Sequence, residues 1–143
     1  LTINNSNFQF NGAGSFIIES ITRDTLPTNG DIKISNSNFN ENKAGVVYNN
    51  ISNVSIDNCT IKNDDFYNHT VYQYVIGKSL KISKTNFSGY FKTLAISFGQ
   101  IDSLLITDSN FDLALANNTH MIYGGAKNVK IKKPTELSTG FLK

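Results

Sequence analysis

Apolar and polar residues alternate in short stretches that recur along this chain. The clearest is an eight-residue motif with aliphatic residues at its first and third positions, a small residue at the sixth and a large apolar residue at the eighth. It spans 1–8, 32–39, 54–61, 80–87 and 104–111, and a sixth copy opens at Val129. Successive copies begin 22 to 31 residues apart, a spacing typical of proteins built from stacked repeats.

The alternation within each copy predicts a β-strand with one apolar face. In the fourth copy, Leu80 and Ile82 share one face, whereas Lys81 and Ser83 share the other. One copy cannot bury its apolar face alone, but stacked copies can. The motif therefore predicts an all-β fold, a right-handed parallel β-helix of about five to six coils with roughly 22–31 residues per coil. Helical repeats would need longer segments with a 3.6-residue period, and these runs are short and rich in β-branched residues.

Two columns of side chains are expected to stack in the core of this fold. They are Leu1, Ile32, Val54, Leu80 and Leu104, and Phe8, Phe39, Ile61, Phe87 and Phe111. A second apolar stretch follows each motif and begins at Phe16, Val46, Tyr74, Leu94 and Met121. Each coil is therefore expected to hold at least two strands joined by turns.

Two polar positions of the motif carry specific expectations. The seventh residue is Asn in four of the five complete copies, for example Asn38 and Asn86. Because Asn tolerates turn angles and its amide can bond an identical neighbour, this column is expected to form a turn and an amide ladder. Cys59 takes the sixth position, which the other copies fill with Ser or Thr. We expect it to be a small buried side chain rather than a reactive thiol.

The repeats indicate how the chain is organised. Residues 1–133 are expected to be a single β-helix domain with a loop insertion at 22–30, which contains Pro27. Residues 134–143 are expected to be a C-terminal tail or the start of a further coil. The first strand opens directly at Leu1 and carries no polar cap. We therefore expect further β-helix coils, or identical copies placed end to end, to stack on this segment.

Composition and charge narrow the function classes. The chain has 13 basic and 11 acidic residues and a net charge of +2, which argues against a nucleic-acid partner. It has no run of about 18 apolar residues, so no transmembrane helix is predicted. Asn is abundant, but the regular apolar positions argue against a disordered chain.

Two segments resemble a known family of repeats. Residues 39–48 read FNENKAGVVY, which resembles the FxxN and GGA[ILV] repeat pair of chlamydial polymorphic membrane proteins and related β-helix adhesins. Residues 8–14 are similar to the same pair. The resemblance implies a pectin-lyase-like β-helix in a secreted or cell-surface protein that serves adhesion or forms a stalk or filament. It carries over no catalytic residue.

A carbohydrate-binding or polysaccharide-cleaving β-helix is the alternative function. Cleavage needs clustered carboxylates, or a basic residue beside a metal-bound substrate, on one outer face. Asp57 and Asp108 are expected two coils apart, about 9.6 Å along the axis. Arg23, the only arginine, lies in the insertion. His69 and His120 have no Cys or His at metal-ligand spacing. We therefore expect no catalytic residue, cofactor or metal site, and a non-catalytic structural or adhesive role outside the cell.

Asparagines in the sequon Asn-x-Ser/Thr are candidates for glycan attachment in a secreted protein. The candidates are Asn68, Asn117, Asn50 and Asn4, and sequons also occur at Asn53, Asn58 and Asn86. We expect Asn86 to be a poor acceptor because it lies in the predicted turn column.

A tyrosine patch is a candidate glycan contact, because sugar sites combine aromatic platforms with carboxylates. Tyr67, Tyr72 and Tyr90 are expected to lie together beside Asp64 and Asp65. The other interpretation is that these tyrosines cover a less regular side of the coils.

A lysine column is a second candidate contact. The alternation places Lys33, Lys81 and Lys130 in one outer column, on alternate coils. Such a column suits an anionic glycan, and an ordinary solvated face is the other interpretation.

Overall fold

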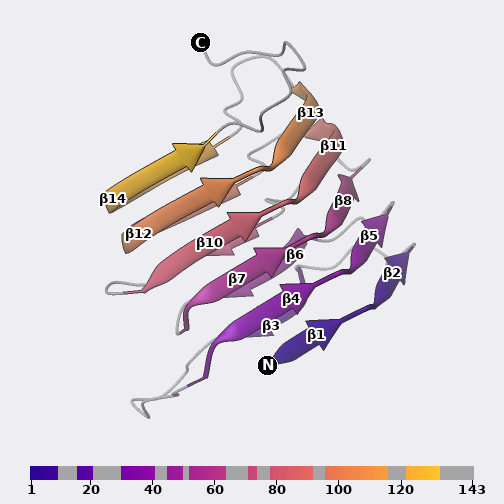
Figure 1. Ribbon diagram of the computed structural model, residues 1–143, viewed down its shortest axis with the longest axis horizontal. Coiled ribbons are helices and arrows are strands. Elements are labelled where there is room, and N and C mark those ends of the chain that lie inside the picture. Colours follow the sequence, from indigo (N-terminus) through magenta and orange to yellow (C-terminus); the bar gives the residue numbers. More distant parts are fainter. Residues whose placement is uncertain are drawn as a thin grey trace.

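The computed structural model describes residues 1–9, 16–20, 30–40, 45–49, 52–63, 71–73, 78–91, 96–115 and 122–132. Within these ranges the chain forms fourteen strands and no helix. Each strand pairing among them is parallel. The predicted all-β class and the predicted parallel pairing are confirmed (Figure 1).

The strands form three rows, which together make up two sheets. The first row contains β1 (Thr2–Asn4), β4 (Ile32–Ser35), β7 (Val54–Asp57), β10 (Ser79–Ser83), β12 (Ile96–Thr107) and β14 (Ile122–Lys132). The second row contains β2 (Asn7–Gln9), β5 (Asn38–Asn40), β8 (Thr60–Asn63), β11 (Asn86–Phe91) and β13 (Asn110–Leu115). The third row contains β3 (Phe16–Ser20), β6 (Gly45–Asn49) and β9 (Val71–Gln73). In Figure 1 the first row runs across the front, and the second row lies beside it.

The long strand β12 connects the third row to the first. Its first residues, 96–98, pair with β9, whereas residues 103–107 pair with β10. The register of β12 against β14 shifts between Phe98 and Ile101. Beside this shift Gly124 has a φ of +155°, and a Cβ there would lie 2.0 Å from the Phe98 carbonyl oxygen. A glycine therefore lets β14 lie close against β12 where the strand passes between rows.

The register of the first row follows the motif. Thr2 pairs with Lys33, Lys33 with Ser55, Ser55 with Lys81, Lys81 with Leu105 and Leu105 with Lys130. Consecutive partners are 22 to 31 residues apart, as the spacing of the motif predicts. Each copy of the motif therefore stands directly on the next.

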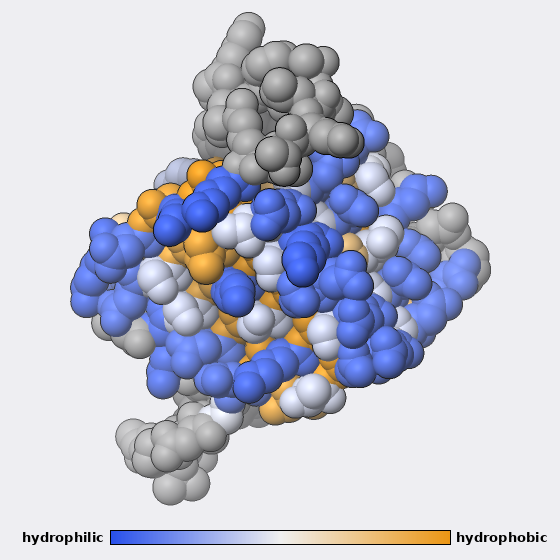
Figure 2. Space-filling view, viewed as in Figure 1, coloured by the Kyte–Doolittle hydropathy of each residue, from blue (hydrophilic) through white to orange (hydrophobic). Residues whose placement is uncertain are grey.

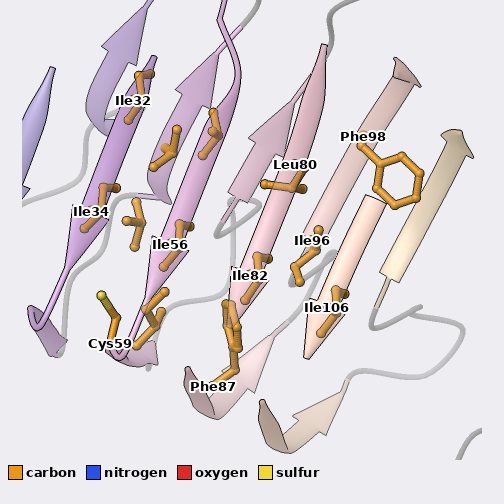
Figure 3. Close-up of a cluster of buried hydrophobic side chains, with 14 of the residues drawn as sticks. Ile32, Ile34, Ile56, Cys59, Leu80, Ile82, Phe87, Ile96, Phe98 and Ile106 are labelled. Atoms are coloured by element: carbon orange, nitrogen blue, oxygen red, sulfur yellow. The ribbon is translucent and has the colours of Figure 1, made fainter. Parts of the chain in front are cut away.

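The apolar columns form the core, as predicted, except at one end. Ile32, Val54, Leu80 and Leu104 are each at most 2% exposed. Figure 3 shows the neighbouring buried column of Ile34, Ile56, Ile82 and Ile106. The prediction that Leu1 is buried is wrong, because this residue is 63% exposed. Leu1 lies at the end of the column, with Ile32 on one side and no described residue on the other.

The second apolar column stacks large side chains. Phe39, Ile61 and Phe87 are at most 1% exposed, and Phe8 and Phe111 are partly buried. The rings of Phe8 and Phe39 stack with centroids 4.9 Å apart, and those of Phe87 and Phe111 with centroids 4.8 Å apart. Ile61 lies between the two aromatic pairs in the register.

The turn inside the motif lies two residues before the predicted position. Among the described residues, five that are not glycine adopt the left-handed conformation, with φ between 49° and 51°: Asn5, Asn36, Asn58, Lys84 and Asp108. They occupy the fifth position of the motif, and the seventh position already belongs to a second-row strand, for example Asn38 in β5 and Asn86 in β11. The prediction of a turn at the seventh position is therefore wrong. Each motif contains two strands, not one, with a sharp bend between them.

Some predicted features lie outside the described residues. These are most of the insertion at 22–30, the tail at 134–143 and the apolar stretch at 74–76. In that repeat the described third-row strand is β9, which precedes 74–76 in the chain.

Candidate functional site

The small residues of the motif form a polar column inside the core. Ser37, Cys59, Thr85 and Ser109 are all buried, and Ser6 is partly buried. Each side chain donates a hydrogen bond to the carbonyl oxygen two residues earlier, as Thr85 does to Ser83 at 2.9 Å. The hydroxyls of Ser37, Thr85 and Ser109 also each accept a hydrogen bond from the backbone N–H of the equivalent residue in the previous repeat. Thr85, for example, accepts from Cys59 at 3.4 Å, and Ser109 accepts from Thr85 at 3.2 Å. The column therefore links adjacent repeats through the core.

Cys59 fits this column, as predicted for a small buried side chain. Its exposed fraction is 2%, and its Sγ donates to the Asp57 carbonyl oxygen at 3.2 Å. Burial raises the pKa of the Cys59 thiol above its ordinary value, while backbone hydrogen bonds with Ser37 and Asp57 oppose this shift. The thiol is therefore held in its protonated, unreactive form.

The outer face of the first row carries the predicted lysine column. The strand register places Thr2, Lys33, Ser55, Lys81, Leu105 and Lys130 in line, and we call this set the lysine column. Its three lysines are all exposed. Figure 2 views this face and shows hydrophilic residues over much of it, with narrow strips of hydrophobic residues between them.

The carboxylates that flank the lysine column are held by other partners. Asn53 Nδ2 donates to Asp31 Oδ1 at 3.0 Å, and Ser83 Oγ donates to Asp57 Oδ1 at 2.6 Å. Lys127 Nζ lies 2.7 Å from Asp102 Oδ1. The three lysines of the column form no ion pair with any residue in the described ranges. Their exposed ammonium groups therefore have no carboxylate partner in the part of the chain that the structure describes.

An amide ladder lies along the corner between the first and second rows. Asn58 Nδ2 donates to Asn36 Oδ1 at 2.7 Å, and Asn36 Nδ2 donates to Asn4 Oδ1 at 2.9 Å. Ser35 Oγ also donates to Asn4 Oδ1, at 2.9 Å. An amide ladder was predicted, but it joins the left-handed residues Asn58 and Asn36 to Asn4, at the fourth position of its motif, rather than the seventh-position asparagines.

The described sequons differ in how free their side-chain amides are. Asn4, Asn53 and Asn58 all take part in side-chain hydrogen bonds. Asn86 is exposed, and among the described sequon asparagines its amide is the one with no hydrogen bond. Asn86 is also the first residue of β11, so the expectation that it lies in a turn is wrong. The candidates Asn50, Asn68 and Asn117 lie outside the described residues.

The predicted tyrosine patch stays a prediction. Tyr67, Asp64 and Asp65 lie outside the described residues. The backbone of Tyr72 belongs to β9 in the third row, and that of Tyr90 to β11 in the second row. The register aligns Tyr72 with Tyr48 and with Ser97, and Ser97 with Tyr123. Sequence reasoning missed this alignment because the distance from the motif to the third row varies between repeats.

The described carboxylates are dispersed over the repeats. Asp57 and Asp108 belong to repeats separated by β10, consistent with the predicted spacing. Across the described part of the chain, no group of three or more His, Cys, Asp or Glu side chains is placed to hold a metal ion. None of the described elements is a helix long and apolar enough to span a membrane.

Comparison of the chain with protein-family models, curated proteins and solved structures gave no match.

Proposed function

We propose that this chain is a right-handed parallel β-helix segment with a non-catalytic structural or adhesive role, displayed outside the cell or on its surface. The observation that carries the proposal is the register of the first row, in which every repeat stands on the next over buried columns. Right-handedness follows from the rule that nearly all crossovers between parallel strands are right-handed. A rigid stack that presents side chains at fixed spacing suits a stalk or an adhesive surface.

The two ends of the stack support a partner of the same kind. At one end of the stack Leu1 is 63% exposed, and at the other end Val129 is 58% and Ile131 48% exposed. By contrast, their partners in the strand register, Leu104 for Val129 and Ile106 for Ile131, are at most 2% exposed. An open parallel edge with alternating apolar side chains matches the edge of another coil. The proposed partners are further coils or an identical copy placed head to tail, a contact that propagates rather than closes.

Sedimentation of the protein over a range of concentrations tests this stacking. We expect the mean mass to rise with concentration for the wild type. The double variant Val129→Lys/Ile131→Lys should stay monomeric, because it places two charges where a coil would stack. The matched control Ser55→Lys/Leu105→Lys adds the same charge on the outer face and should associate like the wild type. A wild type that stays monomeric throughout would refute stacking between copies.

A direct assay tests the absence of catalysis. The protein is incubated with polygalacturonate or another acidic polysaccharide, and new reducing or unsaturated chain ends are measured. No increase is expected over a boiled sample. Sustained release of chain ends would overturn the non-catalytic proposal in favour of a polysaccharide-cleaving β-helix.

A further inference from the structure

We propose that the lysine column binds a linear acidic polysaccharide laid along the stack of the first row. This inference rests on the proposed surface role and specifies the chemical class of its ligand. Lys33, Lys81 and Lys130 stand on β4, β10 and β14, which belong to one continuous ladder. The ladder therefore sets the separation of the three side chains along the stack.

The spacing of the lysines is the first argument. They occupy every second strand of the first row. Neighbouring strands lie about 4.8 Å apart, so the lysine backbones recur about every 9.6 Å. A sugar unit in an extended chain is about as long as one strand spacing. An acidic group on alternate sugars would therefore meet one lysine after another.

The surroundings of the lysines are the second argument. The strands between them place Ser55 and Leu105 in the column. A serine hydroxyl can bond a sugar hydroxyl, and a partly exposed leucine can pack on the apolar face of a sugar ring. None of the three column lysines forms an ion pair within the described residues, so their ammonium groups are available to an anionic ligand. Asp31 and Asp57 accept hydrogen bonds from Asn53 and Ser83, and Asp102 is paired with Lys127.

Nucleic acid fits this face less well. Phosphates recur about every 3.4 Å along each strand of a duplex, much closer than the lysines. Sequence-tolerant binding of single strands relies on aromatic platforms for the bases. The first-row segments 2–4, 32–35, 54–57, 79–83, 103–107 and 128–132 contain no aromatic residue. The observations therefore favour a polysaccharide.

The test is binding of the protein to hyaluronan, which carries one carboxylate on each disaccharide, measured by titration calorimetry at low and moderate salt. Wild-type binding should weaken as salt rises, because screening weakens contacts between exposed charges. The variant Lys33→Ser/Lys81→Ser should lose affinity by roughly tenfold or more. The matched control Lys62→Ser/Lys84→Asn removes the same charge away from the column and should bind within about twofold of the wild type.

Further variants and probes separate the alternatives. Lys33→Arg/Lys81→Arg keeps the charges and should bind like the wild type. Equal losses in the column and control variants would overturn the proposal, because net charge alone would then explain binding. Tighter binding of oligo-thymidine than of hyaluronan would overturn it in favour of nucleic acid, and no binding to hyaluronan would end it. These outcomes leave the sedimentation result untouched, so failure of this inference is distinguishable from failure of the proposed function.

Discussion

At the scale of single residues, the polar column in the core explains why a buried position is filled by Ser, Thr or Cys. A buried hydroxyl costs free energy unless it is hydrogen-bonded. Here Thr85 both donates to Ser83 and accepts from Cys59, so its buried hydroxyl is hydrogen-bonded as donor and as acceptor. The accepted bond also satisfies a backbone N–H at the turn, where the ladder is interrupted. The side chain therefore stands in for a backbone partner.

Replacement of Thr85 tests this role. Thr85→Val keeps the shape but removes the hydroxyl, which leaves the Cys59 N–H and the Ser83 carbonyl without these bonds. We expect the free energy of unfolding to fall by about 1–3 kcal/mol, measured by urea denaturation. Thr85→Ser keeps the hydroxyl and serves as the control. If Thr85→Val is as stable as the wild type, the hydrogen bonds of the hydroxyl do not contribute, because this variant keeps the methyl group and lacks only the hydroxyl.

Cys59 makes the stability depend on pH. Because burial raises the pKa of its thiol, the folded state keeps a proton that the unfolded state releases. The stabilisation is complete below the unfolded thiol value of about 8.5 and is lost as pH rises through the higher folded value. In the Cys59→Thr variant, the hydroxyl does not lose its proton in this pH range. We expect the unfolding free energy of the wild type, relative to this variant, to decline above that pH in denaturation series. A constant difference would contradict the assignment.

Asn86 carries a prediction about modification. Its exposed amide contrasts with those of Asn4, Asn53 and Asn58, which take part in hydrogen bonds. If the protein is expressed through a eukaryotic secretory pathway, glycopeptide mapping should find Asn86 more fully occupied than these three. Higher occupancy at Asn58, the turn residue of the amide ladder, would reverse this ranking and show that the ladder does not protect it.

At the scale of elements, the motif shows how far a sequence pattern reaches. The alternation of apolar and polar residues identified the first-row strands and the side chains that point into the core. In a strand, every second side chain lies on the same face, so an apolar residue at every second position marks the buried face. It could not locate the bend, because polarity does not report the backbone angle φ. Asn occurs at both the fifth and the seventh positions, for example as Asn36 and Asn38. Only the backbone separates the left-handed residue from the first residue of the next strand.

Lys84 is the turn residue least suited to its conformation. It has a φ of 49°, whereas three of the equivalent positions hold Asn. The left-handed region costs most residues about 1–2 kcal/mol, and Asn tolerates it better because its side chain bonds locally. Lys84→Asn should therefore raise the free energy of unfolding by on the order of 0.5–1 kcal/mol, measured by urea denaturation. Lys62→Asn, in a strand, is the control and should not stabilise. A destabilised Lys84→Asn variant would contradict the argument.

At the scale of the whole molecule, each repeat pairs with its neighbours alone. The chain separation between partners is set by the repeat, so the lysine column and the apolar columns could be read from the motif. The third row could be predicted only in part. The apolar stretches that begin at Phe16 and Val46 lie in β3 and β6, but β9 begins at Val71, before the stretch expected at Tyr74, because the segments that lead to the row differ in length and composition. Val71–Gln73, for example, stands in register with Gly45–Asn49 although no shared motif marks it. The position of a third-row strand is hard to predict because the number of residues between the motif and that strand varies, not because the strand lacks hydrophobic residues.

This architecture predicts a gradient of local stability along the stack. Repeats in such proteins are stabilised by their own contacts and by nearest neighbours, so end repeats with one neighbour open more easily than central ones. Amide hydrogen exchange at low protein concentration should be slowest in β7 and β10 and faster in β1 and β14. At high concentration β1 and β14 should become protected if copies stack, with no change in β7. The variant Val129→Lys/Ile131→Lys should lose that concentration-dependent protection. Strong protection of β1 in the dilute protein would contradict the open edge, because a strand that pairs with β4 alone among the described strands opens locally at a low cost in free energy.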